Sequence, residues 1–100
     1  MDNRPIGFFD SGLGGLTSVM ELHETLPNEK VIYFGDTART PYGSKSPETI
    51  KEFAEQIVDY LVSKDVKLII IACNTVTAMA LDSLREKYPQ VPIYGVIGPV

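Results

Sequence analysis

Apolar residues along this chain fall into short unbroken runs that alternate with longer segments of helical spacing. The short runs predict four buried strands, at residues 5–9, 30–34, 67–72 and 91–96. The longer segments predict three helices, at about residues 16–26, 47–61 and 76–88. Ser46 is the expected N-cap of the second helix, and Pro47 is its expected first residue.

Strands that alternate with helices of crossover length predict an α/β fold, namely a doubly wound parallel sheet with helices on both faces. The run 67–72 has no polar alternation, which is typical of a strand covered on both faces. Of the 100 residues, 44% are hydrophobic and 22% are charged, so we expect a single domain over residues 1–100.

Charge and cysteine content exclude several classes of partner. The formal net charge of −4 argues against a nucleic acid, because a phosphate backbone favours a basic face. The longest apolar stretch, Leu68–Cys73, is far shorter than the ~20 residues of a membrane span, and the N-terminus has no secretory signal pattern. The single cysteine, Cys73, cannot form an internal disulfide, which suits a reducing compartment. We therefore expect a cytoplasmic protein without a membrane partner.

Polar loops follow three of the predicted strands. These loops contain Asp10-Ser11 after the first strand, Gly35-Asp36 and Pro41-Tyr42-Gly43 after the second, and Cys73-Asn74-Thr75 after the third. Parallel strands point their carboxyl ends to the same side of a sheet, and ligands of such sheets bind beyond this edge. The sequence therefore predicts that the three loops form one site.

The loop Asp10–Gly15 is rich in glycine and leads into the first expected helix. Its backbone N–H groups should lie open at a helix N-terminus, which favours an anion such as a carboxylate. A dinucleotide site is an alternative, but the Gly-x-Gly-x-x-Gly pattern is only partly matched, because Thr17 stands at its third place. It is equally consistent that Asp10 only caps the turn and that the glycines allow tight packing.

Cys73 is the sharper candidate for chemistry. It lies between a buried strand and a helix N-terminus, whose dipole favours the thiolate form, and Asn74 and Thr75 offer donors beside it. The alternative is a buried thiol that acts as a small hydrophobe, with Asn74 and Thr75 serving only as helix caps.

Three motifs follow one another along the chain, namely Phe9–Leu16, Gly35–Gly43 and Ala72–Ala78. Taken together, they closely resemble the N-terminal domain of bacterial glutamate racemase. The resemblance implies a cofactor-independent isomerase that interconverts L- and D-glutamate and supplies D-glutamate for peptidoglycan, and so for cell wall biogenesis and cell shape.

The resemblance also assigns roles to individual residues. It implies that Cys73 is one of two catalytic cysteines, each contributed by one of two similar α/β domains, and that Asp10 assists proton handling near the substrate ammonium group. The further substrate-binding residues that it implies are Ser11, Tyr42, Gly43, Asn74 and Thr75. It implies neither a cofactor nor a metal.

The chain departs from the family pattern in one main respect, because no cysteine follows Cys73. We therefore expect that the second catalytic domain is absent from this chain, and that the isolated chain has little or no racemase turnover. The expected partners are glutamate and a second racemase domain or partner chain, with a homodimer as a further option. The alternatives are an enzyme of the aspartate racemase type and a non-catalytic domain that binds a small acidic ligand.

Overall fold

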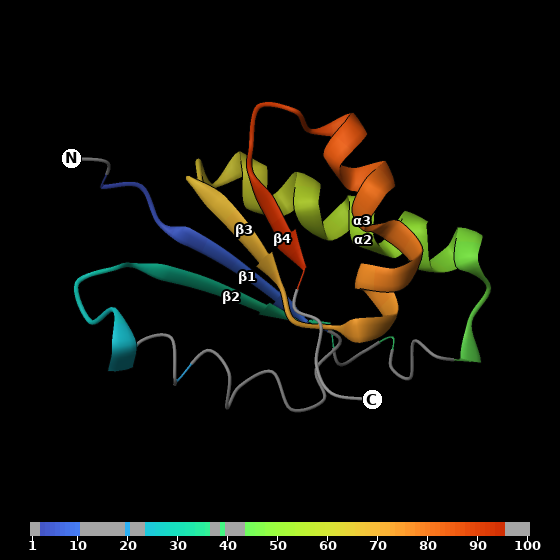
Figure 1. Cartoon of the computed structure of the whole chain (residues 1–100), viewed down its shortest axis with the longest axis horizontal. Helices are drawn as coiled ribbons and strands as arrows, with labels where there is room; N and C mark the ends of the chain where they lie inside the picture. Colours follow the sequence, from blue (N-terminus) through green and yellow to red (C-terminus); the bar gives the residue numbers. More distant parts are fainter. Residues whose placement is uncertain (1–2, 11–19, 21–23, 37–38, 40–43, 96–100) are drawn as a thin grey trace.

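The computed structural model describes residues 3–10, 20, 24–36, 39 and 44–95. These residues contain four strands and two helices in the order β1 (Ile6–Asp10), β2 (Val31–Gly35), α2 (Pro47–Ser63), β3 (Leu68–Ile71), α3 (Asn74–Lys87) and β4 (Ile93–Gly95). The strands form one parallel sheet with the order β2-β1-β3-β4 (Figure 1). The prediction of a parallel α/β sheet is thus confirmed.

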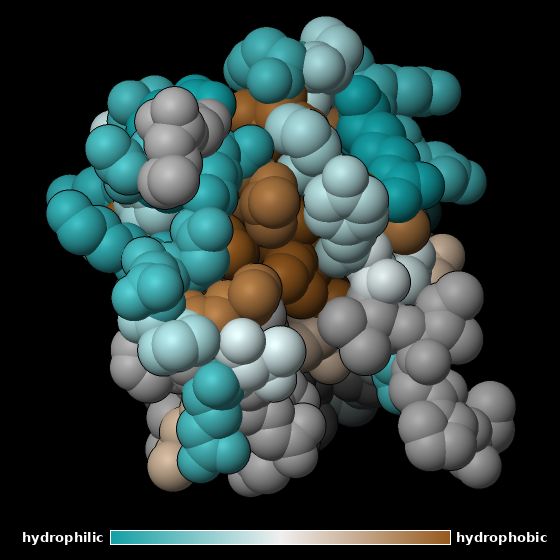
Figure 2. All heavy atoms as spheres, turned by 60° about the vertical axis from the view of Figure 1, so that its left-hand side comes forward, coloured by the Kyte–Doolittle hydropathy of each residue, from teal (hydrophilic) through white to brown (hydrophobic). Residues whose placement is uncertain are grey.

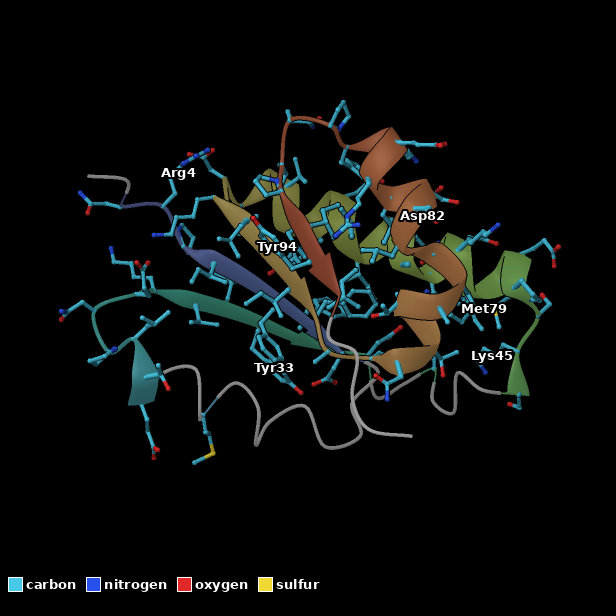
Figure 3. The ribbon with its side chains drawn as sticks, in the orientation of Figure 1. Arg4, Tyr33, Lys45, Met79, Asp82 and Tyr94 are labelled. Carbon is cyan, nitrogen blue, oxygen red and sulfur yellow. The ribbon has the colours of Figure 1, made fainter. Side chains whose placement is uncertain are left out.

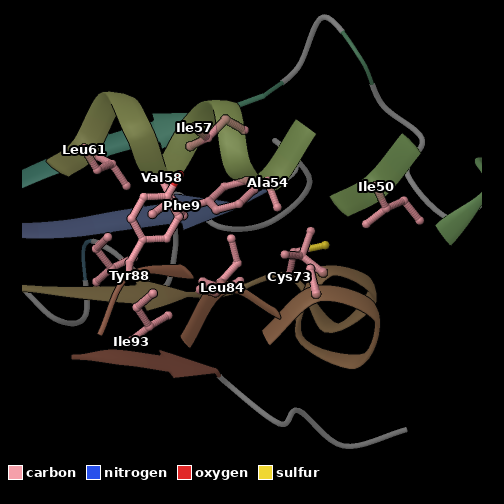
Figure 4. Close-up of a cluster of buried hydrophobic side chains, with 14 of the residues drawn as sticks. Phe9, Ile50, Ala54, Ile57, Val58, Leu61, Cys73, Leu84, Tyr88 and Ile93 are labelled. Carbon is pink, nitrogen blue, oxygen red and sulfur yellow. The ribbon is translucent and has the colours of Figure 1, made fainter. Parts of the chain in front are cut away.

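Both described helices lie on the same face of this sheet and pack against each other (Figure 1). Alternate strand residues such as Phe9, Ile69 and Ile71 point into the core between sheet and helices, as the period of two in a strand requires. The helices contribute an apolar stripe to the same core, made of Ile50, Ala54, Ile57, Val58, Leu61, Val76, Ala80 and Leu84 (Figure 4). The core therefore holds α2 and α3 against β1, β3 and β4.

The start of α2 follows the prediction. The Ser46 side chain accepts a hydrogen bond from the Thr49 backbone N–H at 3.2 Å, and Pro47 is the first helical residue. Such a cap satisfies one of the N–H groups that a helix leaves unpaired at its N-terminus.

The prediction of three helices needs correction, because the described residues contain two. The first expected helix, at about 16–26, falls mainly on residues 11–19 and 21–23, which lie outside the described residues. The sequence predicted helices on both faces of the sheet; in the described part of the chain, α2 and α3 both lie on one face. The strand ends also shift by one or two residues, because apolar runs do not define where backbone pairing stops.

Strand order reverses between β1 and β3. From β1 the chain goes to β2 at one edge, and β3 and β4 are then added on the other side of β1. In open α/β sheets, ligands bind beyond the carboxyl ends of the strands at such a reversal. The fold therefore points to the ends of β1 and β3, where Asp10 and Cys73 lie.

The second face of the sheet is buried at β1, where Ile6 and Phe8 lie, and more open on the neighbouring strands. Val31, Leu68 and Ile70 on this face are half-buried, and Tyr94 is exposed. Figure 2 shows apolar side chains grouped at the surface with hydrophilic ones around them. Within the described ranges, no helix has the length and apolar character needed to cross a membrane.

Candidate functional site

Asp10 is the last residue of β1, and both its main-chain carbonyl group and its side chain accept hydrogen bonds. It is only 1% exposed. The Asp36 backbone N–H donates a hydrogen bond to the Asp10 carbonyl oxygen at 3.1 Å, and the Tyr33 hydroxyl donates to Asp10 Oδ2 at 2.8 Å. A buried carboxylate is costly unless such donors satisfy it, so these bonds fix its position at the sheet edge.

Cys73 follows the neighbouring strand β3. Phe9 pairs with Ile71, and the Ala72 backbone N–H donates to the Phe9 carbonyl oxygen at 2.8 Å, so the pairing of β1 with β3 continues up to the residue before Cys73. Asp10 and Cys73 therefore come directly after the residues through which β1 and β3 pair. Both residues lie at the carboxyl edge of the sheet, Cys73 in the core cluster and Asp10 on the other face.

The Cys73 side chain occupies the N-cap position of α3 but makes no cap hydrogen bond. It is 9% exposed and belongs to the hydrophobic cluster. In Figure 4 it lies toward the end of the cluster near Ile50 and away from Leu61. The thiol thus borders both the core and the sheet edge, and its sulfur is not committed to capping the helix.

The structure describes only part of the remaining predicted site. Asn74 and Thr75 are the first residues of α3, directly after Cys73; Asn74 is exposed and Thr75 is half-buried. Neither is the N-cap, because Cys73 holds that position. Ser11, Tyr42 and Gly43 lie outside the described residues.

Arg39 forms a connection that was not predicted. Its Nε donates to Asp36 Oδ2 at 2.8 Å, its Nη1 donates to Gln56 Oε1 at 2.5 Å, and its guanidinium carbon lies 4.0 Å from the centre of the Phe53 ring. Arg39 thereby ties the residue after β2 to the side of α2, just before the segment that carries Pro41 to Gly43. A planar guanidinium can make these bonds and the ring contact together.

Tyr33 is the second residue that sequence analysis did not single out. Partial burial, the hydrogen bond to Asp10 and the repulsion of a phenolate by the Asp10 carboxylate raise the pKa of Tyr33 from 10.0 to about 12. Its strand position was predicted, but its pairing with β1 was not, and only this register places the phenol beside Asp10. Among the described residues, no group of three or more His, Cys, Asp or Glu side chains could hold a metal ion.

Asp10 and Cys73 thus bring a carboxylate and a thiol to the strand reversal of an α/β domain. This pair is a candidate site for proton transfer. A comparison with models of protein families finds no match. A glutamate racemase from Streptococcus gordonii is 56% identical over 99 residues, which are 99% of this chain and 37% of that relative.

Solved structures give the same result. The glutamate racemase of Francisella tularensis in complex with D-glutamate matches 95% of this chain and 36% of its own, with 55% identity and a TM-score of 0.89. The Escherichia coli glutamate racemase in complex with L-glutamate and an activator, UDP-MurNAc-ala, matches 94% of this chain and 36% of its own, with 38% identity and a TM-score of 0.85. This chain is a homologue of the glutamate racemases, and it spans about a third of their length.

Proposed function

We propose that this chain forms one half of a glutamate racemase site, with Cys73 as one of two bases that transfer a proton at the substrate α-carbon. The second half comes from another α/β domain, either further along a longer protein or from a partner chain. The observation that carries the proposal is the placement of Asp10 and Cys73 at the ends of adjacent strands where the strand order reverses.

The chemistry requires two opposed groups. In one direction the Cys73 thiolate takes the α-proton and becomes a thiol, while a thiol on the other face of the planar carbanion gives its proton and becomes a thiolate. In the reverse direction the two groups exchange roles, and no electrons enter or leave. A carbanion formed without a cofactor needs fixed donors around it and a base within reach.

Asp10 and the loops have supporting roles in this proposal. The Asp10 carboxylate lies near the substrate ammonium group and assists proton handling. Ser11 lies beside Asp10, and the substrate carboxylates receive hydrogen bonds from residues Tyr42, Gly43, Asn74 and Thr75. A cytoplasmic location is part of the same proposal, because the free thiol of Cys73 suits a reducing compartment.

Glutamate as substrate is supported by the relatives. One solved relative binds D-glutamate and another binds L-glutamate, and both match nearly the whole of this chain. A site that accepts both enantiomers is what a racemase needs, since the product of one direction is the substrate of the other.

A hybrid enzyme tests the proposal. In this hybrid, the present chain replaces the matching N-terminal part of the Streptococcus gordonii relative, whose 56% identity favours correct docking of the two parts. We expect the hybrid to racemise glutamate in both directions, and we expect Cys73→Ser to lower kcat by at least about a hundredfold, because a hydroxyl is a far weaker acid and base than a thiol at neutral pH. Circular dichroism of glutamate solutions measures the rate.

Two controls make the result decisive. Met79→Leu changes an exposed side chain of α3 and should keep the activity of the hybrid. The unmodified relative, prepared in the same way, shows that the assay works. A folded hybrid that leaves glutamate unchanged, or a Cys73→Ser variant as fast as its parent, contradicts the proposal.

A further inference from the structure

Tyr33 and Asp10 lie on the same face of the sheet, on neighbouring strands. In the pairing of β1 with β2, Phe8 is opposite Tyr33 and Asp10 is opposite Gly35. Residues opposite each other in a parallel pair share a face, so this face is the one turned away from the core of α2 and α3. Tyr33 projects from β2 on this side in Figure 3.

Two neighbours determine the direction of the Tyr33 side chain. Its ring packs on Phe8, with ring centres 6.0 Å apart and planes inclined by 37°. From there the ring extends over Gly35 toward the carboxyl end of the sheet. A Cβ atom on Gly35 would lie 2.8 Å from the Tyr33 hydroxyl oxygen and 3.2 Å from two ring carbons.

The missing side chain at Gly35 therefore leaves the room that the phenol needs. The hydroxyl fills this room and donates to Asp10 Oδ2 at 2.8 Å. A larger residue at position 35 would push the phenol away from Asp10. The glycine two residues after Tyr33 therefore allows Tyr33 to form its hydrogen bond to the neighbouring strand.

We propose that Tyr33 is a positioning residue for Asp10, whose carboxylate it holds in place at the carboxyl end of β1 through the hydrogen bond to Oδ2. The inference rests on the proposed function, because it gives Asp10 its orientation in the racemase site. Tyr33 is hydrogen-bonded to Asp10 and acts on the site through that carboxylate. Its pKa of about 12 keeps the phenol protonated, and therefore a donor, throughout the neutral range.

Tyr33→Phe in the hybrid enzyme tests this role. The variant removes one oxygen atom and keeps the ring on Phe8, so the fold should persist. We expect kcat to fall about tenfold, the usual effect of one lost hydrogen bond to a charged group, with a smaller change in KM. A merely structural role would lower the melting temperature and leave kcat and KM of the folded enzyme unchanged.

Gly35→Ala provides a second, independent variant. It should reproduce the loss of Tyr33→Phe, because the added methyl group displaces the phenol. In the Tyr33→Phe background, Gly35→Ala should cost much less, because the hydroxyl that it displaces is already gone. Tyr94→Phe is the matched control, since it removes a hydroxyl from an exposed tyrosine of the same sheet and should change neither kcat nor KM.

The outcomes separate the two proposals. If Tyr33→Phe keeps the parent kcat while Asp10→Asn is strongly impaired, the positioning role is wrong and the proposed function stands. The same conclusion follows if Gly35→Ala and Tyr33→Phe act additively. If Cys73→Ser is fully active, the proposed function itself fails, whatever Tyr33→Phe does.

Discussion

At the scale of single residues, the account depends on how side chains at the strand ends are held. The position of Asp10 at the functional edge of a parallel sheet could be predicted from the sequence, whereas its role as a site residue came from the resemblance to glutamate racemase. Its hydrogen bond from Tyr33 could not be predicted, since it depends on the register that sets Asp10 opposite Gly35. Sequence patterns locate strands, but register comes from packing across the whole sheet.

The ionisation of Tyr33 is a direct check on this contact. Tyr33 and Tyr88 both have raised pKa values, in each case first through burial and then through a carboxylate that accepts a hydrogen bond from the phenol, Asp10 for Tyr33 and Asp59 for Tyr88. We expect an ultraviolet titration of the chain to show a late class of tyrosines, with Tyr33 ionising near pH 12. Asp10→Asn should lower the pKa of Tyr33, because it removes the negative charge that opposes a phenolate, and Tyr33→Phe should remove this transition altogether.

The same shift has a consequence for stability. Because the pKa of Tyr33 rises from 10.0 in the free side chain to about 12 in the fold, its contribution is complete below pH 10 and is lost as the pH rises through 12. Tyr33→Phe should therefore reduce the loss of folding stability over this alkaline range. An Asp10→Asn titration that coincides with that of the parent would show that the contact does not exist in solution.

At the scale of secondary structure elements, the hydrophobic pattern predicted the four strands and the two described helices well. Their ends were predicted less well: α3 begins at Asn74, whereas the apolar spacing suggested Val76. The reason is physical, because a helix begins where a backbone N–H first finds its partner, here the Thr77 N–H bonded to the Cys73 carbonyl oxygen at 3.0 Å. The two helix starts also differ, since Ser46 caps α2 with its side chain and Cys73 leaves its sulfur uncommitted.

The cap of α2 can be tested on the chain as it stands. Ser46→Ala should lower the free energy of unfolding by about 1 kcal/mol, because the Thr49 N–H loses its partner. In a domain of this size, a loss of that amount corresponds to a decrease in melting temperature of about 4–8 °C. Ser46→Asp keeps an acceptor at the cap and should stay close to the parent. Equal melting temperatures for Ser46→Ala and the parent would contradict the assignment.

At the scale of the whole molecule, the strand order and the candidate site residues point to the same edge of the sheet. Alternating elements predicted a parallel sheet, but they could not predict the order β2-β1-β3-β4, because many orders satisfy the same alternation. It is this order that places the reversal between β1 and β3, and with it Asp10 and Cys73. This chain spans about a third of the length of its relatives. The proposed role of Asp10 and Cys73 in proton transfer therefore also requires the second half of the site, from another domain.

The central claim, that Cys73 is the base on one face of the substrate, is tested most directly by isotope exchange. The hybrid enzyme carrying Cys73→Ser is incubated in D2O with L-glutamate and with D-glutamate in separate samples, and deuterium at the α-carbon is followed by proton NMR. The remaining thiol still serves its own face, so we predict exchange of one enantiomer without racemisation and the loss of exchange for the other. Equal exchange of both enantiomers at the rate of the parent hybrid would contradict the claim.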